Sequence, residues 1–283
     1  EWMHAAVPIL MESCASVKLD YEEFEKDKVI GEGSFGLVSL GMYRGVKVAI
    51  KETKSYTWPD DVVKNFLKEV KMMDQMRCPY IINFIGAVET PGHYAIVTEY
   101  AKFGCLKSFY TSDKYSYILA TKMLLDVARG MVFLHTSRMI HRDMKPDNVL
   151  IVSYSKKEKV NAKISDFGST RSILMDSINQ QMTKGVGTPI YMAPELISNE
   201  EYSFGVDVFA FAIVCYEVLT RKIPYTSMNF VHSWDVSDFV SKGNRLPIPD
   251  TIDSTMSNLI TRCWAQDPEQ RPHFEETDRK SVV

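Results

Sequence analysis

Several signatures of membrane, disulfide-bonded and repetitive proteins are missing from this sequence of 283 residues. No uninterrupted apolar run reaches the roughly 18 residues that a membrane-spanning helix needs. The five cysteines are scattered without a C-x-x-C pair, which argues against a disulfide framework or a zinc site and favours a reducing compartment. Internal repeats and low-complexity tracts are absent, and the short apolar stretch 5–11 lacks the basic leader of a signal peptide.

Charge is also close to balanced. The formal net charge is −3, so we expect no general attraction to nucleic acid or to anionic lipid. These absences together predict a cytoplasmic protein with no membrane segment of its own in this chain, either free or as the intracellular part of a larger or membrane-attached protein.

What is present indicates a substantial core. With 45% hydrophobic and 24% charged residues, the composition is that of a globular protein, and the length predicts one large domain or two lobes. Residues 1–22 have no strong pattern and are interpreted as a leader or linker. The most hydrophobic segment, Val206 to Leu219, carries Asp207 and Glu217 and is predicted to be a buried helix.

The most informative stretch, at 141–148, reads His-Arg-Asp-Met-Lys-Pro-Asp-Asn. Asp143 could accept a proton from an attacking hydroxyl, Lys145 could offset charge on a transferring phosphoryl group, and Asn148 could hold a divalent cation. An ordinary polar loop closed by a proline turn is the structural alternative.

A glycine-rich stretch precedes it, with Gly31, Gly33 and Gly36 in the pattern G-x-G-x-x-G-x-V. Glycines let backbone N–H groups approach phosphate oxygens without a Cβ in the way. Dinucleotide-binding proteins use a similar pattern, but they continue into a helix. Here the strand patterns 37–42 and 46–52 follow, and they favour a β-hairpin that covers a bound nucleotide.

The second of these strands places Lys51 among apolar neighbours, so its stem faces inward and its ammonium needs a partner. Pro59 and two aspartates predict a helix start, and apolar residues then recur at helical spacing around Glu69. Glu69 is the predicted partner of Lys51. A solvated acid on the helix face is the alternative.

The remaining pattern predicts strands at 81–89 and 93–99, a helix at 118–134 and a short strand pair at 149–152 and 161–164. Asp166-Phe167-Gly168 follows, and Asp166 is a second candidate metal ligand because Mg²⁺ takes oxygen ligands. Residues 169–184 are rich in hydroxyls and poor in apolar periodicity. Arg271 is a candidate partner for Glu195.

These motifs, in this order, resemble the eukaryotic protein kinase domain over about residues 24–276. Lys145 and Gly187-Thr188 are similar to serine/threonine kinases, whereas 96–100 and 262–264 are similar to tyrosine kinases. That mixture resembles the tyrosine-kinase-like group, whose members mostly phosphorylate serine and threonine.

The resemblance implies an α+β, bilobal kinase fold: a small antiparallel-sheet N-lobe with one helix at 23–100, and a larger, mainly helical C-lobe at 101–283. It implies ATP and Mg²⁺ as cofactors, with Asn148 and Asp166 as metal ligands and Asp207 as an anchor for the backbone of the catalytic loop. The implied catalytic residues are Lys51, Glu69, Asp143, Lys145, Asn148 and Asp166. The implied nucleotide-binding residues are Ile30, Gly31, Gly33, Gly36, Val38, Ala49, Lys51, Thr98, Glu99, Ala101 and Leu150.

The implied activity is transfer of the γ-phosphate of ATP to serine or threonine hydroxyls of a protein substrate. A dual-specificity or tyrosine kinase is one alternative, and a pseudokinase scaffold is an alternative of another class. Arg142 is expected to pair with a phosphate on the hydroxyl-rich segment, with Thr183 and then Ser177 as the candidate sites. The oligomeric state is left open.

Overall fold

The computed structural model describes residues 17–33, 36–52, 60–90, 92–172, 188–198, 200–228, 230 and 232–276. The chain divides into two compact units. The first comprises the chain up to Met76 together with Phe84–Tyr100, and the second comprises Arg77–Asn83 and the chain from Ala101 onward.

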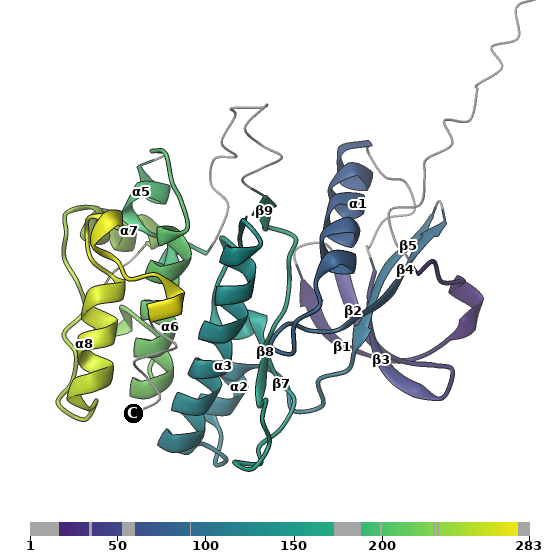
Figure 1. Cartoon of the computed structure of the whole chain (residues 1–283), viewed down its shortest axis with the longest axis horizontal. Coiled ribbons are helices and arrows are strands. Elements are labelled where there is room, and N and C mark those ends of the chain that lie inside the picture. Colours follow the sequence, from purple (N-terminus) through teal and green to yellow (C-terminus); the bar gives the residue numbers. More distant parts are fainter. Residues whose placement is uncertain are drawn as a thin grey trace, which may run out of the picture. The chain divides into compact units, whose positions relative to one another are not determined.

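The first unit is an antiparallel sheet with one helix, as predicted. The strands run in the order β1-β2-β3-β5-β4, and α1 contacts β4 (Figure 1). The elements of this unit are η1 (Tyr21–Glu23), β1 (Phe24–Gly33), β2 (Gly36–Tyr43), β3 (Val46–Glu52), α1 (Asp60–Gln75), β4 (Phe84–Thr90) and β5 (His93–Glu99). The predicted strands at 37–42, 46–52 and 93–99 are confirmed as β2, β3 and β5.

One face of this sheet carries an apolar core. Val48 and Ile50 of β3 are buried there with Val97 of β5, because alternate residues of a strand share a face. Leu19 completes this core at 3% exposure, and its backbone N–H donates to Ala87 O at 2.9 Å. The sequence pattern placed Leu19 in a leader, but the structure packs it against the sheet.

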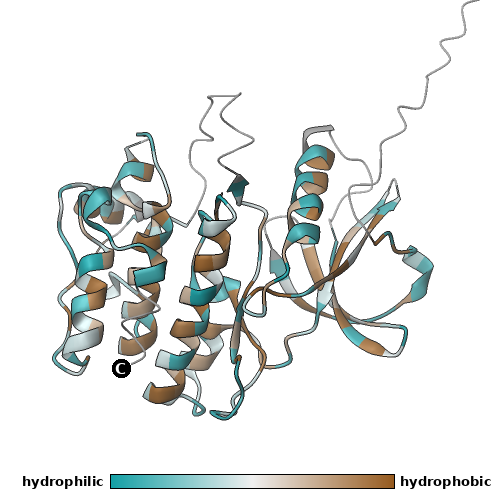
Figure 2. Cartoon of the chain, in the orientation of Figure 1, coloured by the Kyte–Doolittle hydropathy of each residue, from teal (hydrophilic) through white to brown (hydrophobic). Residues whose placement is uncertain are grey.

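The second unit is mainly helical, as the fold class predicted, and α6 is its most apolar element. Every residue from Val206 to Leu219 is buried, and Figure 2 shows α6 largely in the hydrophobic colour. The helices of this unit are α2 (Leu106–Thr111), α3 (Tyr117–Thr136), α5 (Pro194–Ile197), α6 (Gly205–Thr220), α7 (Ser233–Ser241) and α8 (Ser254–Cys263). Its short strands and 3-10 turns are β6 (Met139–Ile140), η2 (Pro146–Asn148), β7 (Val149–Ile151), β8 (Ala162–Ile164), β9 (Arg171–Ser172), η3 (Pro189–Tyr191), η4 (Thr226–Met228) and η5 (Pro268–Gln270).

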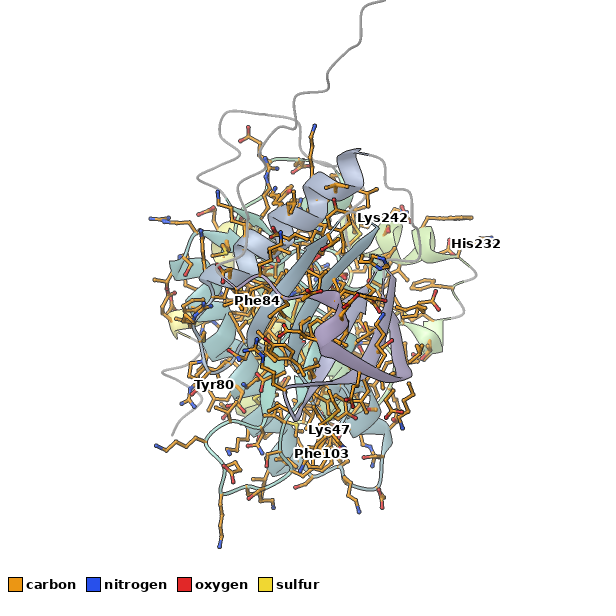
Figure 3. All side chains as sticks on the ribbon, turned by 90° about the vertical axis from the view of Figure 1, so that its right-hand side faces the viewer. Lys47, Tyr80, Phe84, Phe103, His232 and Lys242 are labelled. Carbon is orange, nitrogen blue, oxygen red and sulfur yellow. The ribbon has the colours of Figure 1, made fainter. Side chains whose placement is uncertain are left out.

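The prediction of one strand from Ile81 to Glu89 was wrong at its start, since β4 begins at Phe84. The backbone of the preceding residues is bonded to β8 instead. Ile164 N donates to Tyr80 O at 2.8 Å and Ile82 N donates to Ile164 O at 2.9 Å (Tyr80 is labelled in Figure 3). These bonds hold the segment 77–83 in the second unit, and an apolar run gives no indication of which strand will take its hydrogen bonds.

A buried ion pair joins α5 to the C-terminal part of this unit. The guanidinium of Arg271 donates to both carboxylate oxygens of Glu195, at 2.6 and 2.9 Å, and both residues are 5% exposed. Such a bidentate pair compensates the desolvation of both charges, so neither residue can be neutralised without leaving a buried charge alone. The predicted partnership is therefore present in the structure.

No helix in the described part of the chain is both long enough and apolar enough to cross a bilayer.

Asp126 of α3 is a second buried acid, and its hydrogen-bond donors among the described residues are backbone N–H groups. Its Oδ2 accepts the backbone N–H groups of Asn161, at 2.7 Å, and Ala162, at 3.2 Å. Its Oδ1 is buried and accepts no hydrogen bond from the residues that the structure describes. Burial raises the pKa of Asp126, against the opposing effect of the two N–H donors.

This raised pKa predicts a pH dependence of stability. Between the pKa of an unfolded aspartate, about 3.9, and the raised value, the folded state binds more protons than the unfolded state, so the free energy of unfolding falls as the pH rises. Asp126→Asn removes this titration. The unfolding free energy of each protein is measured with urea from pH 4 to 7. We expect it to fall by less for Asp126→Asn than for the parent over this range. The difference should be about 1.4 kcal/mol for each unit of pKa shift.

The exposed Asp238, which pairs with Lys242, provides a matched control, since Asp238→Asn removes one carboxylate from the surface of the same unit. If the unfolding free energies of the parent and of Asp126→Asn changed equally with pH, the raised pKa of Asp126 in the folded chain would be contradicted.

Candidate active site

In the first unit, Lys51 of β3 reaches Glu69 of α1. The Lys51 Nζ atom lies 2.9 Å from Glu69 Oε1, and the two side chains are 17% and 3% exposed. Glu69 is therefore a buried acid, which excludes the alternative of a solvated acid on the helix face. A buried carboxylate needs such a partner, and the pair sets the position of the lysine head group.

Other predicted nucleotide-binding residues share the face of Lys51. Val38 is the cross-strand partner of Lys51, and Ala49 is the partner of Thr98. Because cross-strand partners and alternate positions lie on one face, these side chains point away from the Val48–Ile50 core. Each of the four is partly exposed. The same face thus presents small or aliphatic side chains beside the ammonium group of Lys51.

The glycine-rich stretch forms the predicted β-hairpin, with Gly31 and Gly33 at the end of β1 and Gly36 at the start of β2. Gly33 is the register partner of Gly36. The helix that a dinucleotide-binding fold would place after the last glycine is replaced by β2, so that alternative is excluded. Ile30 precedes these glycines and is 39% exposed.

In the second unit, residues 141–145 form a loop between β6 and η2. The carboxylate of Asp207 in α6 binds the backbone of this loop. The backbone N–H groups of His141 and Arg142 each donate to the Asp207 carboxylate at 2.8 Å, and His135 Nε2 lies 2.9 Å from it. Although burial opposes ionisation, these partners, His135 first, keep the pKa of Asp207 below its ordinary value. The expected anchoring contact is present.

Asp143 forms a triangle of hydrogen-bonded side chains with Lys145 and Thr188. Lys145 Nζ donates to Asp143 Oδ2 at 2.7 Å and to Thr188 Oγ1 at 3.0 Å, and the Thr188 hydroxyl donates to Asp143 Oδ1 at 3.0 Å. Asp143 and Lys145 keep 14% and 23% of their side-chain surfaces exposed. An oriented carboxylate and an ammonium are thus both accessible at one point.

Asn148 is joined to the same group. Its Nδ2 donates to the backbone carbonyl of Asp143 at 2.8 Å and to Asp143 Oδ2 at 3.2 Å. With the amide nitrogen engaged by Asp143, the amide oxygen is the atom that Asn148 can offer to a cation.

Asp166 lies at the same end of the β7–β8 ladder as Asn148. Val149 pairs with Ile164, and Ser165 donates to the backbone carbonyl of Asn148 from its N–H, at 2.8 Å, and from its hydroxyl, at 3.0 Å. Asp166 follows with φ of +61°, an uncommon backbone conformation that the surrounding structure must enforce.

Two contacts made by His141 hold the start of the loop in place. His141 Nε2 lies 3.2 Å from the carbonyl of Ser165, and Phe167, 1% exposed, packs edge-on against the imidazole with centroids 5.5 Å apart. The buried phenyl ring therefore links the Asp166 turn to the loop that carries Asp143.

The donor set fits a hard divalent cation. Asn148 and Asp166 carry side-chain oxygen atoms, the kind of ligand that Mg²⁺ prefers, and two such ligands would leave most of an octahedral shell for water or phosphate. No cluster of three or more histidine, cysteine or acidic side chains that could hold a metal occurs in the described ranges.

Arg142 does not contact an acid within the part of the chain that the structure describes. Its Nε donates to the backbone carbonyl of Ser169 at 2.6 Å and its Nη1 to the hydroxyl of Tyr202 at 3.0 Å. The candidate phosphate acceptors Ser177 and Thr183 lie outside the described residues, as does Gly187.

Glu99 and Ala101 lie where the sequence passes from the first unit to the second, and Leu150 pairs with a residue shortly after that point. Glu99 ends β5, and Ala101 is the residue at which the second unit resumes. Leu150 of β7 forms an isolated bridge with Cys105, and Ile151 N donates to Gly104 O at 2.8 Å.

Sequence reasoning missed two contributors to this site. The side chain of Thr188 was noted only as a family feature, although its hydroxyl contacts both Asp143 and Lys145. Tyr202 was not singled out, because a tyrosine in an irregular stretch carries no periodic signal. Only the hydroxyl at an otherwise apolar turn distinguished Thr188 in the sequence.

Comparison with known proteins agrees with this geometry. The family model described as protein tyrosine and serine/threonine kinase matches residues 24–280. The probable serine/threonine-protein kinase gdt2 of Dictyostelium discoideum is 33% identical, over 91% of this chain and 15% of its own length. The dual specificity protein kinase shkB of the same organism is 33% identical, over 92% of this chain and 40% of its own length.

A plant protein is also similar to nearly the whole of this chain. Serine/threonine-protein kinase STY17 of Arabidopsis thaliana is 32% identical, over 98% of this chain and 47% of its own length. The chain therefore spans less than half the length of each of these three relatives. With a family match over most of its length, and with the kinase motifs on the elements described above, the chain belongs to the protein kinase family.

Proposed function

We propose that this chain transfers the γ-phosphoryl group of ATP to serine or threonine hydroxyls of a protein substrate. The observation that carries the proposal is the triangle of Asp143, Lys145 and Thr188. It combines a base for the attacking hydroxyl with a cation for the phosphoryl oxygens, and family membership supports the use of ATP.

Asp143 would accept a hydrogen bond from the substrate hydroxyl and orient it for in-line attack on phosphorus. Lys145 would turn from Asp143 toward the transferring group, where negative charge spreads over the equatorial oxygens. Since phosphoryl transfer requires mainly positioning and charge stabilisation, the anchored backbone at His141 and Arg142 matters as much as the reacting side chains.

Lys51 would contact the phosphates of the nucleotide, and Glu69 would hold the lysine head in place for that contact. Asn148 and Asp166 would hold Mg²⁺, which supplies positive charge between phosphate oxygens when it is bound. These roles are supported by the oxygen-bearing residues at the same end of the β7–β8 ladder and by the Lys51–Glu69 pair.

The adenine and ribose would be recognised by residues with small or aliphatic side chains and by backbone groups at the end of β5. The proposed set is Ile30, Gly31, Gly33, Gly36, Val38, Ala49, Thr98, Glu99, Ala101 and Leu150. We further propose residues 24–276 as one catalytic domain, preceded by a leader at 1–22 of which residues 17–22 lie against or beside the sheet.

The preference for serine and threonine is supported by the Lys145–Thr188 contact and by the names of gdt2 and STY17. The name of shkB supports dual specificity as the second candidate. Phosphoamino-acid analysis of a generic protein substrate separates them. Phosphoserine and phosphothreonine alone support the first, and phosphotyrosine beside them supports the second.

Asp143→Asn tests the central role. Replacing the carboxylate with an amide removes the base but keeps the size of the side chain, so we expect turnover to fall by about 10²- to 10⁴-fold. The dissociation constant for a fluorescent ATP analogue should stay within a few-fold of that of the parent. Transfer of radiolabelled phosphate measures the first quantity, and fluorescence titration measures the second.

Unchanged turnover in Asp143→Asn would rule out this role. Binding of nucleotide by the parent without any transfer would favour the pseudokinase alternative.

Thr188→Val tests the triangle separately from the base. Valine has nearly the shape of threonine but no hydroxyl, so Asp143 and Lys145 lose a shared partner while the packing is kept. We expect turnover to fall by roughly 10- to 100-fold with nucleotide affinity unchanged, because the carboxylate is no longer oriented. Thr188→Ser keeps the hydroxyl and should recover most of the loss. Equal activity of the two variants would show that the hydroxyl is not used.

A further inference from the structure

Residues 17–20, which precede β1, add a short parallel strand to the first unit. Lys18 bridges Ala87 of β4 in parallel, whereas the strands β1 to β5 pair with one another antiparallel. Leu19 N donates to Ala87 O at 2.9 Å, and Ala87 N donates to Val17 O at 3.1 Å. This segment, here called the strap, lies along the outer edge of β4 (Figure 1) and pairs backbone groups of Ala87 that would otherwise lack a partner strand.

Gly86 of β4 leaves room for the strap. Its φ is not positive, so the backbone conformation at this position does not require glycine. A Cβ at Gly86 would lie 2.7 Å from Leu19 Cγ and 2.7 Å from Val17 O, and the strap would have to shift. The missing side chain of Gly86 is therefore matched to the docked strap.

The strap also fills the face of the sheet opposite to Lys51. Leu19 is 3% exposed and belongs to one apolar cluster with Val48 and Ile50 of β3. Along β3 these two residues alternate with Ala49 and Lys51, which point to the other face. Leu19 therefore packs behind the strand that carries Lys51.

The chain that follows the strap joins the two edges of the sheet. β4 lies at one edge and β1 at the other, yet only residues 20–23 separate Leu19 from Phe24, where β1 begins. Five residue steps reach at most about 17 Å, whereas the five spacings from the strap to β1 in a flat sheet come to about 24 Å. The sheet must therefore curl, and the strap ties β1, with its Gly31 and Gly33, to β4.

This connection is ordered by its side chains. Asp20 Oδ1 accepts the N–H of Glu22 at 3.2 Å. The ring of Tyr21 lies against that of His93, at the start of β5, with centroids 4.4 Å apart, and the Tyr21 hydroxyl accepts a hydrogen bond from Lys26 Nζ. The strap thus enters β1 through a defined turn.

From these contacts we propose that the outer edge of β4 is an allosteric site whose occupant is the chain's own strap, and that docking of the strap and binding of nucleotide favour each other. The inference rests on the nucleotide site of the proposed function. The strap positions β1 and packs behind β3, and the nucleotide would contact Gly31 and Gly33 of β1 and Lys51 of β3. Two ligands that favour the same arrangement of these strands raise each other's affinity by the same factor.

Variants that undock the strap test the coupling. Gly86→Ala occupies the space of the strap, and Leu19→Ala removes most of its packing. We expect each to raise the dissociation constant for a fluorescent ATP analogue by about 5-fold or more, the lower end of typical allosteric couplings. Leu19→Met nearly conserves the volume of the side chain and should stay within about twofold of the parent.

Val240→Ala in α7 controls for a general loss of stability. Val240 is 1% exposed, and its truncation leaves a cavity in the second unit without touching the strap. Its nucleotide affinity should equal that of the parent. Unchanged affinity in Leu19→Ala and Gly86→Ala, or an equal loss in Val240→Ala, would overturn the coupling.

The parent chain allows a second test without any substitution. Hydrogen exchange of the Ala87 amide reports opening of the strap, because this N–H is bound to Val17 O. Reciprocity predicts that the bound ATP analogue slows this exchange more than it slows exchange in α8, which shows only the general stabilisation by a ligand. Equal slowing at Ala87 and in α8 would overturn the proposal.

Neither measurement uses phosphoryl transfer. Nucleotide binding without transfer would contradict the proposed function alone, and nucleotide binding that is independent of the strap would contradict this inference alone. A parent chain that binds no nucleotide would contradict both.

Discussion

One buried carboxylate organises the candidate active site. Asp207 is 1% exposed within the apolar helix α6, yet it receives hydrogen bonds from the backbone of His141 and Arg142 and contacts His135. Burial alone would favour the protonated acid, but these partners stabilise the charge. Without it, the buried N–H group of His141 and the partly buried N–H group of Arg142 would lack an acceptor, and a buried donor left without one costs about 1–3 kcal/mol. The loop that carries Asp143 is therefore tied to the core.

A second acid of α6, Glu217, binds the turn that follows Thr188. Glu217 is fully buried and accepts hydrogen bonds from Tyr110, at 2.5 Å, and Tyr191, at 2.7 Å. Tyr191 ends η3, the turn that begins directly after Thr188. The helix α6 therefore holds Asp143 through Asp207 and holds the Thr188 turn through Tyr191. The Asp143–Thr188 contact depends on both anchors.

Much of this arrangement could be predicted from local pattern and motif. Alternation predicted β2, β3 and β5, helical spacing predicted α1 and α3, and an inward lysine predicted a partner such as Glu69. The start of β4 could not be predicted, because Ile81 and Ile82 are equally apolar whether they pair with β5 or with β8. The contacts of Thr188 and Tyr202 were also beyond local pattern, since a single hydroxyl contributes nothing to periodicity and its partners are distant in the chain.

The most direct measurement of the central claim is amide hydrogen exchange of His141 and Arg142 in the parent chain and in Asp207→Asn. Asparagine offers one oxygen and turns an NH₂ group toward a donor, so at least one of the two backbone N–H groups loses its acceptor. The account predicts faster exchange at these two amides while the amides of β2 and β3 exchange at the rate of the parent. Equal protection of His141 and Arg142 in both proteins would contradict the role assigned to Asp207.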